Sequence, residues 1–114
     1  MKDTAALMAD FFAQDDLARL TVDAGELLDC PLMVIDDAFR VTAHYAPLGF
    51  TDPLFDRAVQ QGAITYEAGA IISRSPALSA GAPDYVEVAD STRRRRFAPL
   101  ISAGLRLGYL VCVD

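Results

Sequence analysis

The most concentrated charge in the sequence is a run of four arginines, Arg93 to Arg96, within the stretch DSTRRRRFAPL. Such a cluster can neutralise the phosphates of a nucleic acid. In an extended strand, however, Arg93 and Arg95 would face opposite to Arg94 and Arg96, and the net charge of −6 repels phosphate backbones. We therefore interpret the run as the solvated start of a strand that pairs with the excess acids, and we expect no nucleic-acid contact through this domain.

Catalysis by a nucleophile or a general base would have to use His44, the only histidine, or one of the two cysteines, Cys30 and Cys112. The sequence contains neither a Cys-x-x-Cys pair nor a Gly-x-Ser-x-Gly turn. We expect His44 to be exposed or at the edge of the core, and both cysteines to act as small hydrophobic side chains. A thiol-based redox sensor or enzyme would instead need an exposed, deprotonated thiol. The sequence therefore predicts a protein that is not an enzyme.

Neighbouring acids could bind a cation at Asp15-Asp16, at Asp36-Asp37 and at Asp52 with Asp56. None of these groups has the regular spacing of oxygen ligands that a calcium loop requires. Helix caps and turns explain them better, and the sequence has no glycine-rich phosphate loop. We therefore expect no metal and no cofactor.

The length of 114 residues suits one compact domain, and the hydrophobic content of 53% argues against disorder. No apolar run approaches the roughly 20 residues of a membrane span. The N-terminal stretch MKDTAALMADFFAQDD lacks the long apolar core of a signal peptide. With two cysteines read as reduced thiols, we expect a cytoplasmic protein.

Hydrophobic periodicity predicts the elements that must position these residues. Two helices are expected within about residues 4–29, at the start of the chain. The segment SPALSAGAPD, further along, is expected to be a flexible connection. In the second strand, Val41, Ala43 and Tyr45 should share one face. The remaining elements are strands at Leu32–Ile35 and Arg40–Tyr45, a helix between the cap Asp52 and Gly62, a helix capped by Thr65, and strands at Tyr85–Val88, Arg95–Ser102 and Leu105–Val113.

These elements predict an α+β fold with a five-stranded antiparallel sheet and helices on its faces. The first and last strands are apolar at nearly every position, as is typical of strands covered on both faces. We therefore expect them to be neighbours at the centre of the sheet, because edge strands are rarely so apolar.

Two stretches of the sequence resemble the GAF/PAS superfamily of sensor domains: LLDCPLMVIDDAFRVTAHY, similar to its first hairpin, and RFAPLISAGLRLGYLVCVD, similar to its closing hairpin. The order of elements resembles the N-terminal regulatory domains of PucR-type and sugar-diacid-type transcriptional regulators, which precede a helix-turn-helix. The resemblance implies a single GAF/PAS-like domain over residues 1–114, with N-terminal helices at about 4–29 and the sheet and middle helices at about 32–113. It also implies that a DNA-binding part, if the gene encodes one, lies outside these residues.

The resemblance further implies a ligand pocket beneath the segment Pro47 to Asp84, between the sheet and the middle helices. Loops on a rigid sheet commonly carry binding residues. Each aromatic residue in this region could equally complete the core. The candidate ligand-binding residues are Tyr45, Phe50, Tyr66, Glu67 and Arg96, with Arg106 as an alternative anion partner.

A second candidate surface lies in the first helix, where Leu7, Met8, Phe11 and Phe12 form an apolar stripe. Exposed apolar patches of this kind usually contact partners, so we expect a homodimer. The predicted function is thus non-enzymatic sensing of a small molecule within a dimeric transcriptional regulator. The alternative is a dimerisation scaffold of the same fold without a ligand.

Overall fold

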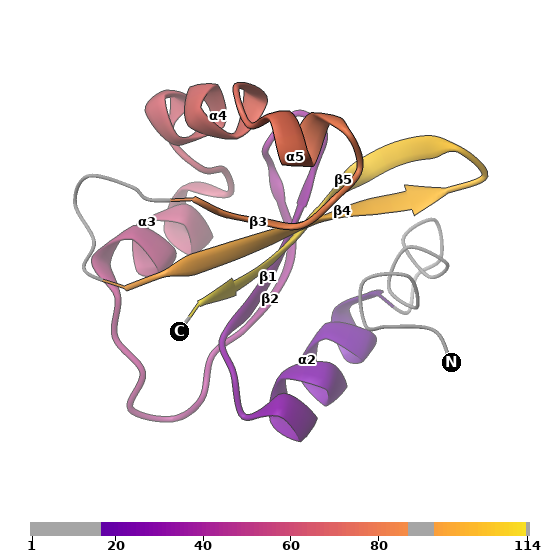
Figure 1. The fold of residues 1–114 in the computed structure, drawn as a ribbon. Helices are drawn as coiled ribbons and strands as arrows, with labels where there is room; N and C mark the ends of the chain where they lie inside the picture. The colour runs from indigo at the N-terminus through magenta and orange to yellow at the C-terminus, as the bar shows by residue number, and fades with distance from the viewer. Residues whose placement is uncertain (1–16, 87–92, 114) are drawn as a thin grey trace.

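The structure is a computed structural model that describes residues 17–86 and 93–113 (Figure 1). An antiparallel sheet of five strands has the order β2-β1-β5-β4-β3, which confirms the expected α+β class and strand number. The strands are β1 (Leu32–Asp36), β2 (Val41–Tyr45), β3 (Asp84–Val86), β4 (Arg95–Ser102) and β5 (Leu105–Val113). The helices are α2 (Leu17–Leu28), α3 (Pro53–Gln61), α4 (Tyr66–Ser73) and α5 (Pro76–Ser79).

Strands β1 and β5 are neighbours inside the sheet, as the apolar sequence of both predicted. Their antiparallel register runs from Leu32 opposite Cys112 to Asp36 opposite Gly108. The two strands approach closely at Gly108, where an added Cβ atom would lie 2.0 Å from the carbonyl oxygen of Ile35. Only glycine fits this position without a shift of the backbone.

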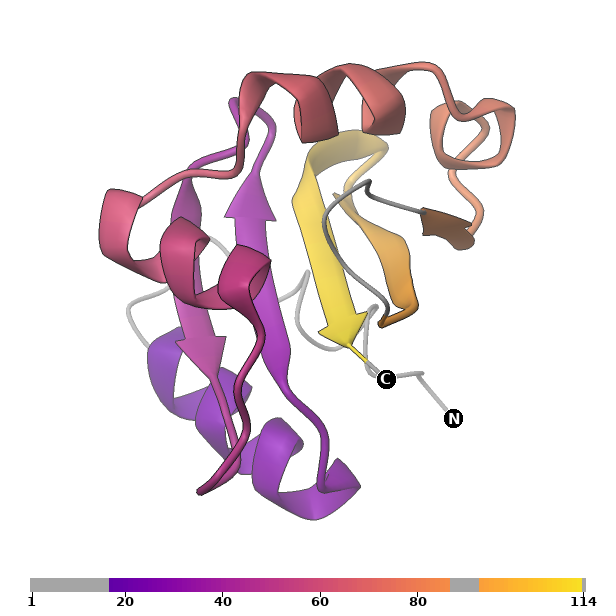
Figure 2. The same cartoon turned by 90° about the vertical axis from the view of Figure 1, so that its left-hand side faces the viewer.

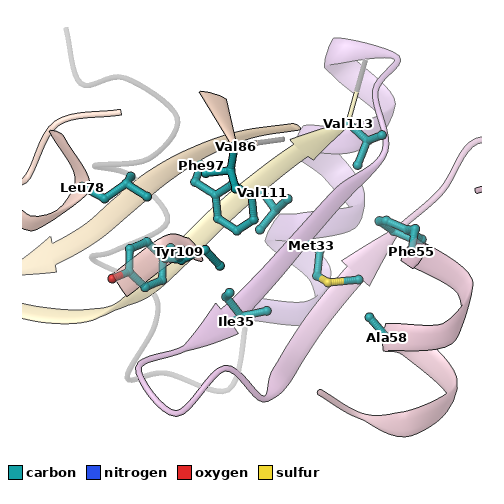
Figure 3. Packing of buried hydrophobic residues seen from close by; sticks show 11 residues of the cluster. Met33, Ile35, Phe55, Ala58, Leu78, Val86, Phe97, Tyr109, Val111 and Val113 are labelled. Carbon is teal, nitrogen blue, oxygen red and sulfur yellow. The ribbon is translucent and has the colours of Figure 1, made fainter. Parts of the chain in front are cut away.

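Helices cover both faces of the sheet (Figure 2). On one face, α2 packs over a cluster built around Leu32, Val34 and Leu110. On the other face, α3, α4 and α5 pack over a larger cluster, in which Met33 extends from β1 toward Phe55 of α3 (Figure 3). Alternate residues of the central strands therefore enter two different cores, which explains why these strands are apolar throughout.

The β1–β2 hairpin departs from the expected alternation at Val41. Its register shifts between Val34, which pairs with Ala43, and Ile35, which pairs with Val41, so that Thr42 is the extra residue of a β-bulge. The bulge moves Val41 to the α3 side, where it packs against that core, while Ala43 stays on the α2 side. The prediction that Val41 shares a face with Ala43 and Tyr45 was therefore wrong.

The middle helices begin and end where local sequence predicts. Asp52 caps α3 by accepting a hydrogen bond from the Phe55 amide at 3.0 Å, and Gly62 closes it with a φ of 77°. Thr65 caps α4 in the same way through the Ala68 amide at 3.2 Å.

The segment expected to be a flexible connection contains the short helix α5 instead. Ser75 caps it by accepting a hydrogen bond from the Leu78 amide, and its hydroxyl donates to Asp84 at 2.8 Å. Leu78 is fully buried against the sheet, so burial of one side chain orders this segment. Strand β3 then begins at Asp84, and the expected residues 87 and 88 lie outside the described ranges.

Candidate functional site

A cavity of about 50 Å³ lies between the sheet and the helices α3 and α4. Its floor is apolar and comes from the strands, and three alanines stand where larger side chains would close it. The apolar residues that line it are Met33, Leu54, Phe55, Ala58, Ala63, Ile64, Ala68, Phe97, Val111 and Val113. The cavity lies in the layer where the resemblance places a ligand pocket.

The polar part of the lining comes mainly from α3 and the turn that follows it. Leu54, Arg57, Ala58 and Gln61 are spaced as i, i+3, i+4 and i+7, so they share the helix face that borders the cavity. Arg57 and Gln61 are exposed, and with Thr65 they form the rim of the cavity. The surface of the cavity is thus almost entirely apolar, and Arg57, Gln61 and Thr65 stand at its edge.

A buried ion pair joins β4 to the start of α3 beside the cavity. The Arg95 guanidinium donates through Nη2 to Oδ2 of Asp52, the same oxygen that caps α3. Nη1 of Arg95 also donates to the Arg93 carbonyl at 3.2 Å. Burial lowers the pKa of Arg95, because desolvation disfavours the charged guanidinium. Asp52 therefore connects the start of α3 to β4, in addition to capping the N-terminus of that helix.

Arg95 corrects the interpretation of the arginine run as a solvated strand entry. Its exposed fraction is only 6%, because it follows the same alternation as buried Phe97 and points toward α3. Arg93 and Arg94 are exposed and lie over aromatic rings, Arg93 at 4.9 Å from the centre of Phe50 and Arg94 at 4.0 Å from that of Tyr85.

The structure does not gather the five predicted ligand-binding residues around one cavity, and none of the five lines the cavity beneath α3 and α4. Tyr45 lies on the α2 side, where an added Cβ on Gly25 would come within 2.0 Å of its ring. Arg96 is exposed and lies opposite Cys112 in the register of β4 and β5. The Cys112 side chain packs on the α2 side of the sheet, so Arg96 also faces that side.

The other three predicted residues lie on the side of α3 and α4 but outside the cavity. Tyr66 is 88% exposed and Glu67 is also exposed, because both stand in the first turn of α4 on its outer surface. Phe50 is half-buried and meets Phe55 edge-on, with 5.5 Å between ring centres. Phe50 therefore supports the wall of α3 without reaching the cavity.

The sequence contained a signal for Arg95 that its interpretation missed. Alternation places Arg95 on the same face as Phe97, a large apolar side chain of the type that strands bury. A charge on that face needs a partner, and Asp52 was assigned only as a helix cap. By contrast, nothing in the local sequence marks Arg57 as a rim residue.

The remaining chemically reactive side chains lie away from the cavity. His44 is exposed, as expected. Cys30 and Cys112 are half-buried thiols beside the core under α2, and the Cys30 sulfur lies 3.6 Å from the Val113 carbonyl oxygen. Across residues 17–86 and 93–113, no group of three or more Cys, His, Asp or Glu side chains is placed to hold a metal ion.

The predicted dimerisation residues Leu7, Met8, Phe11 and Phe12 lie outside the described residues. Within the described ranges, large apolar side chains are exposed near the end of α2 and in the loop after β2, at Leu27, Leu28 and Leu48. No helix in those ranges is long and apolar enough to span a membrane.

The sequence was also compared with known proteins. No protein-family model matches it, and no curated protein matches it.

Proposed function

We propose that this chain is a GAF/PAS-like regulatory domain that binds a small molecule in the cavity between its sheet and helices α3 and α4. It performs no catalysis and acts in the cytoplasm as the sensor part of a PucR-type or sugar-diacid-type transcriptional regulator. The observation that carries the proposal is the cavity itself, which has apolar walls and a few polar side chains at its edge. Ligand pockets combine apolar walls with a few placed polar groups in this manner.

The ion pair between Asp52 and Arg95 gives the site a route for signalling. Asp52 holds the first turn of α3, which borders the cavity, and Arg95 belongs to β4, which pairs with the central strand β5. A ligand that displaces α3 must therefore also disturb a buried contact to the sheet. Such a change can pass along β4 and β5 to an output domain, because buried ion pairs tolerate little displacement.

A thermal-shift screen of metabolites against the wild-type chain tests the proposal, because a ligand that binds only the folded state raises Tm. The variant Ala68→Leu should lose the shift, since Ala68 lines the cavity. Ala18→Leu is the matched control, because Ala18 is an exposed helical alanine on α2. A broad screen without any stabilising compound would exclude ligand sensing.

A dimerisation scaffold without a ligand remains the second candidate function. The exposed apolar side chains Leu28, at 50% exposure, and Leu48 border the same surface depression and favour it, because monomeric proteins seldom leave large apolar patches in water. The two functions are separated by the ligand screen, since a scaffold would dimerise and yet show no compound-dependent change in Tm.

A further inference from the structure

The charged side chains that line the cavity are both arginines, and the Asp52 carboxylate lies beside it in the ion pair with Arg95. Among the described residues, these two arginines are Arg57 and Arg95, and no carboxylate lines the cavity. Arg95 is already bound to Asp52 and to the Arg93 carbonyl. Arg57 is exposed at the rim and forms no ion pair within residues 17–86 and 93–113. A guanidinium of this kind selects planar anions, which it can bind through two parallel hydrogen bonds.

Two acids on the same helices could weaken this selection, and neither lines the cavity. Asp56 precedes Arg57 on α3, but adjacent helical residues do not face each other. Glu67 is exposed in the first turn of α4. The overall charge of −6 acts over longer distances. At 0.1 M ionic strength, salt screens its electrostatic interactions beyond about 10 Å. The local charge at the rim therefore dominates for a small ligand.

The apolar interior admits only a short chain. Its volume of about 50 Å³ is well below the roughly 150 Å³ of a cavity that binds benzene, and a single water needs about 10–15 Å³. The interior therefore accommodates about three to five non-hydrogen atoms. An isopropyl or propyl group fits this space, whereas an aromatic ring does not.

We propose that the ligand of this site is a short-chain carboxylate, with its aliphatic tail in the cavity and its carboxylate at Arg57. Gln61 can donate a second hydrogen bond from the same face of α3. The Thr65 hydroxyl accepts from the Ala68 amide at 3.2 Å and can donate its own proton to a ligand oxygen. This assignment rests on the proposed function, and it adds the chemical class of the ligand.

The test uses isobutyrate and its neutral isostere isobutyramide, titrated into the full chain labelled with ¹⁵N. Residues around the cavity should shift with isobutyrate, with a Kd on the order of 1 mM for a ligand of this size. Isobutyramide should bind about fivefold more weakly, because it lacks the attraction of a partly exposed ion pair. Benzoate should bind more weakly than isobutyrate, because its ring exceeds the cavity.

The variant Arg57→Gln should reduce the affinity for isobutyrate to that for isobutyramide and leave isobutyramide binding unchanged. Arg57 is exposed, so the variant should keep the wild-type Tm, which confirms that it folds. Arg19→Gln provides the matched control, because Arg19 is exposed on α2, on the opposite side of the sheet. It should leave both affinities unchanged.

The outcomes distinguish failure of the carboxylate assignment from failure of the proposed function. Equal affinities for the acid and the amide, or an isobutyrate affinity that survives Arg57→Gln, would overturn the carboxylate assignment while the cavity remained a binding site. Failure of both probes, together with a metabolite of another class that shifts the residues around the cavity, would also overturn only the assignment. If no compound of any class binds, the assignment and the proposed function both fail.

Discussion

Removal of either member of the ion pair between Asp52 and Arg95 should destabilise the domain strongly, because the other charge stays buried without this ion pair. Asp52→Asn keeps a side-chain oxygen that can cap α3 and removes the negative charge beside Arg95. Arg95→Met removes the positive charge and keeps much of the side-chain volume. Both partners are buried, and removal of one member of a buried pair typically costs about 3–5 kcal/mol. We expect each variant to lower the free energy of unfolding by about 3 kcal/mol, or Tm by about 12 °C.

The double variant, Asp52→Asn with Arg95→Met, tests whether the two losses of stability arise from the same ion pair. With both charges removed, no buried charge is left without its partner, so the combined loss should be at least about 2 kcal/mol smaller than the sum of the single losses. Arg40→Met is the matched control. Arg40 makes an exposed ion pair with Asp36 at 2.9 Å, and such pairs contribute at most about 1 kcal/mol.

The measurement is urea denaturation followed by circular dichroism at one protein concentration, because association would shift the midpoint. The slope of the transition should be the same in all variants, which shows that the comparison concerns stability alone. If the two single losses add to within about 0.5 kcal/mol, Asp52 and Arg95 are energetically independent and the signalling route through them is wrong.

Three further predictions concern the sheet, the dimer and nucleic acid. Gly108→Ala should destabilise the domain by more than about 3 kcal/mol in urea denaturation, because its Cβ would lie 2.0 Å from the Ile35 oxygen; a near-wild-type stability would contradict this packing. Light scattering should show a dimer that Phe11→Asp with Phe12→Asp converts to a monomer, and a monomeric wild type at high concentration would refute the dimer. Gel shifts at about 150 mM salt should show no specific DNA binding through Arg93–Arg96, whereas tight, salt-sensitive binding would reverse that expectation.

The elements that the sequence predicted well are those whose signals are local or extreme. The caps at Asp52 and Thr65 follow from side-chain chemistry within one helical turn. The central positions of β1 and β5 follow from apolar residues on both faces of each strand, a pattern that only burial on both sides explains.

The elements that it missed depend on register or on contacts distant in the chain. One bulge residue, Thr42, changes the face on which Val41 lies, and no local feature of the sequence marks a bulge there. Tyr45 was assigned to the ligand without knowledge of which face carries which helices. The partnership of Asp52 with Arg95 spans 43 positions, so only the folded chain brings the two together.

The alanines at the cavity allow a final distinction between a binding site and an imperfectly packed core. Ala68 is only 8% exposed and lines the cavity on the α4 side. If the domain needed a stable core alone, a larger side chain at this position would fill the space and add stability, since cavity-filling substitutions commonly contribute about 0.5–2 kcal/mol. We expect Ala68→Leu to raise the free energy of unfolding by about 1 kcal/mol while abolishing the ligand-induced shift.

Ala18→Leu on α2 again provides the control, because it makes the same change of helix propensity at an exposed site and should alter neither quantity. A gain in stability together with a loss of binding would mean that the empty volume is maintained at a cost to stability, which selection for packing alone would remove. If Ala68→Leu destabilises the domain, the space between α4 and the sheet cannot accept a side chain of that size. A tail of similar size could then not enter it, and the cavity would be a packing defect.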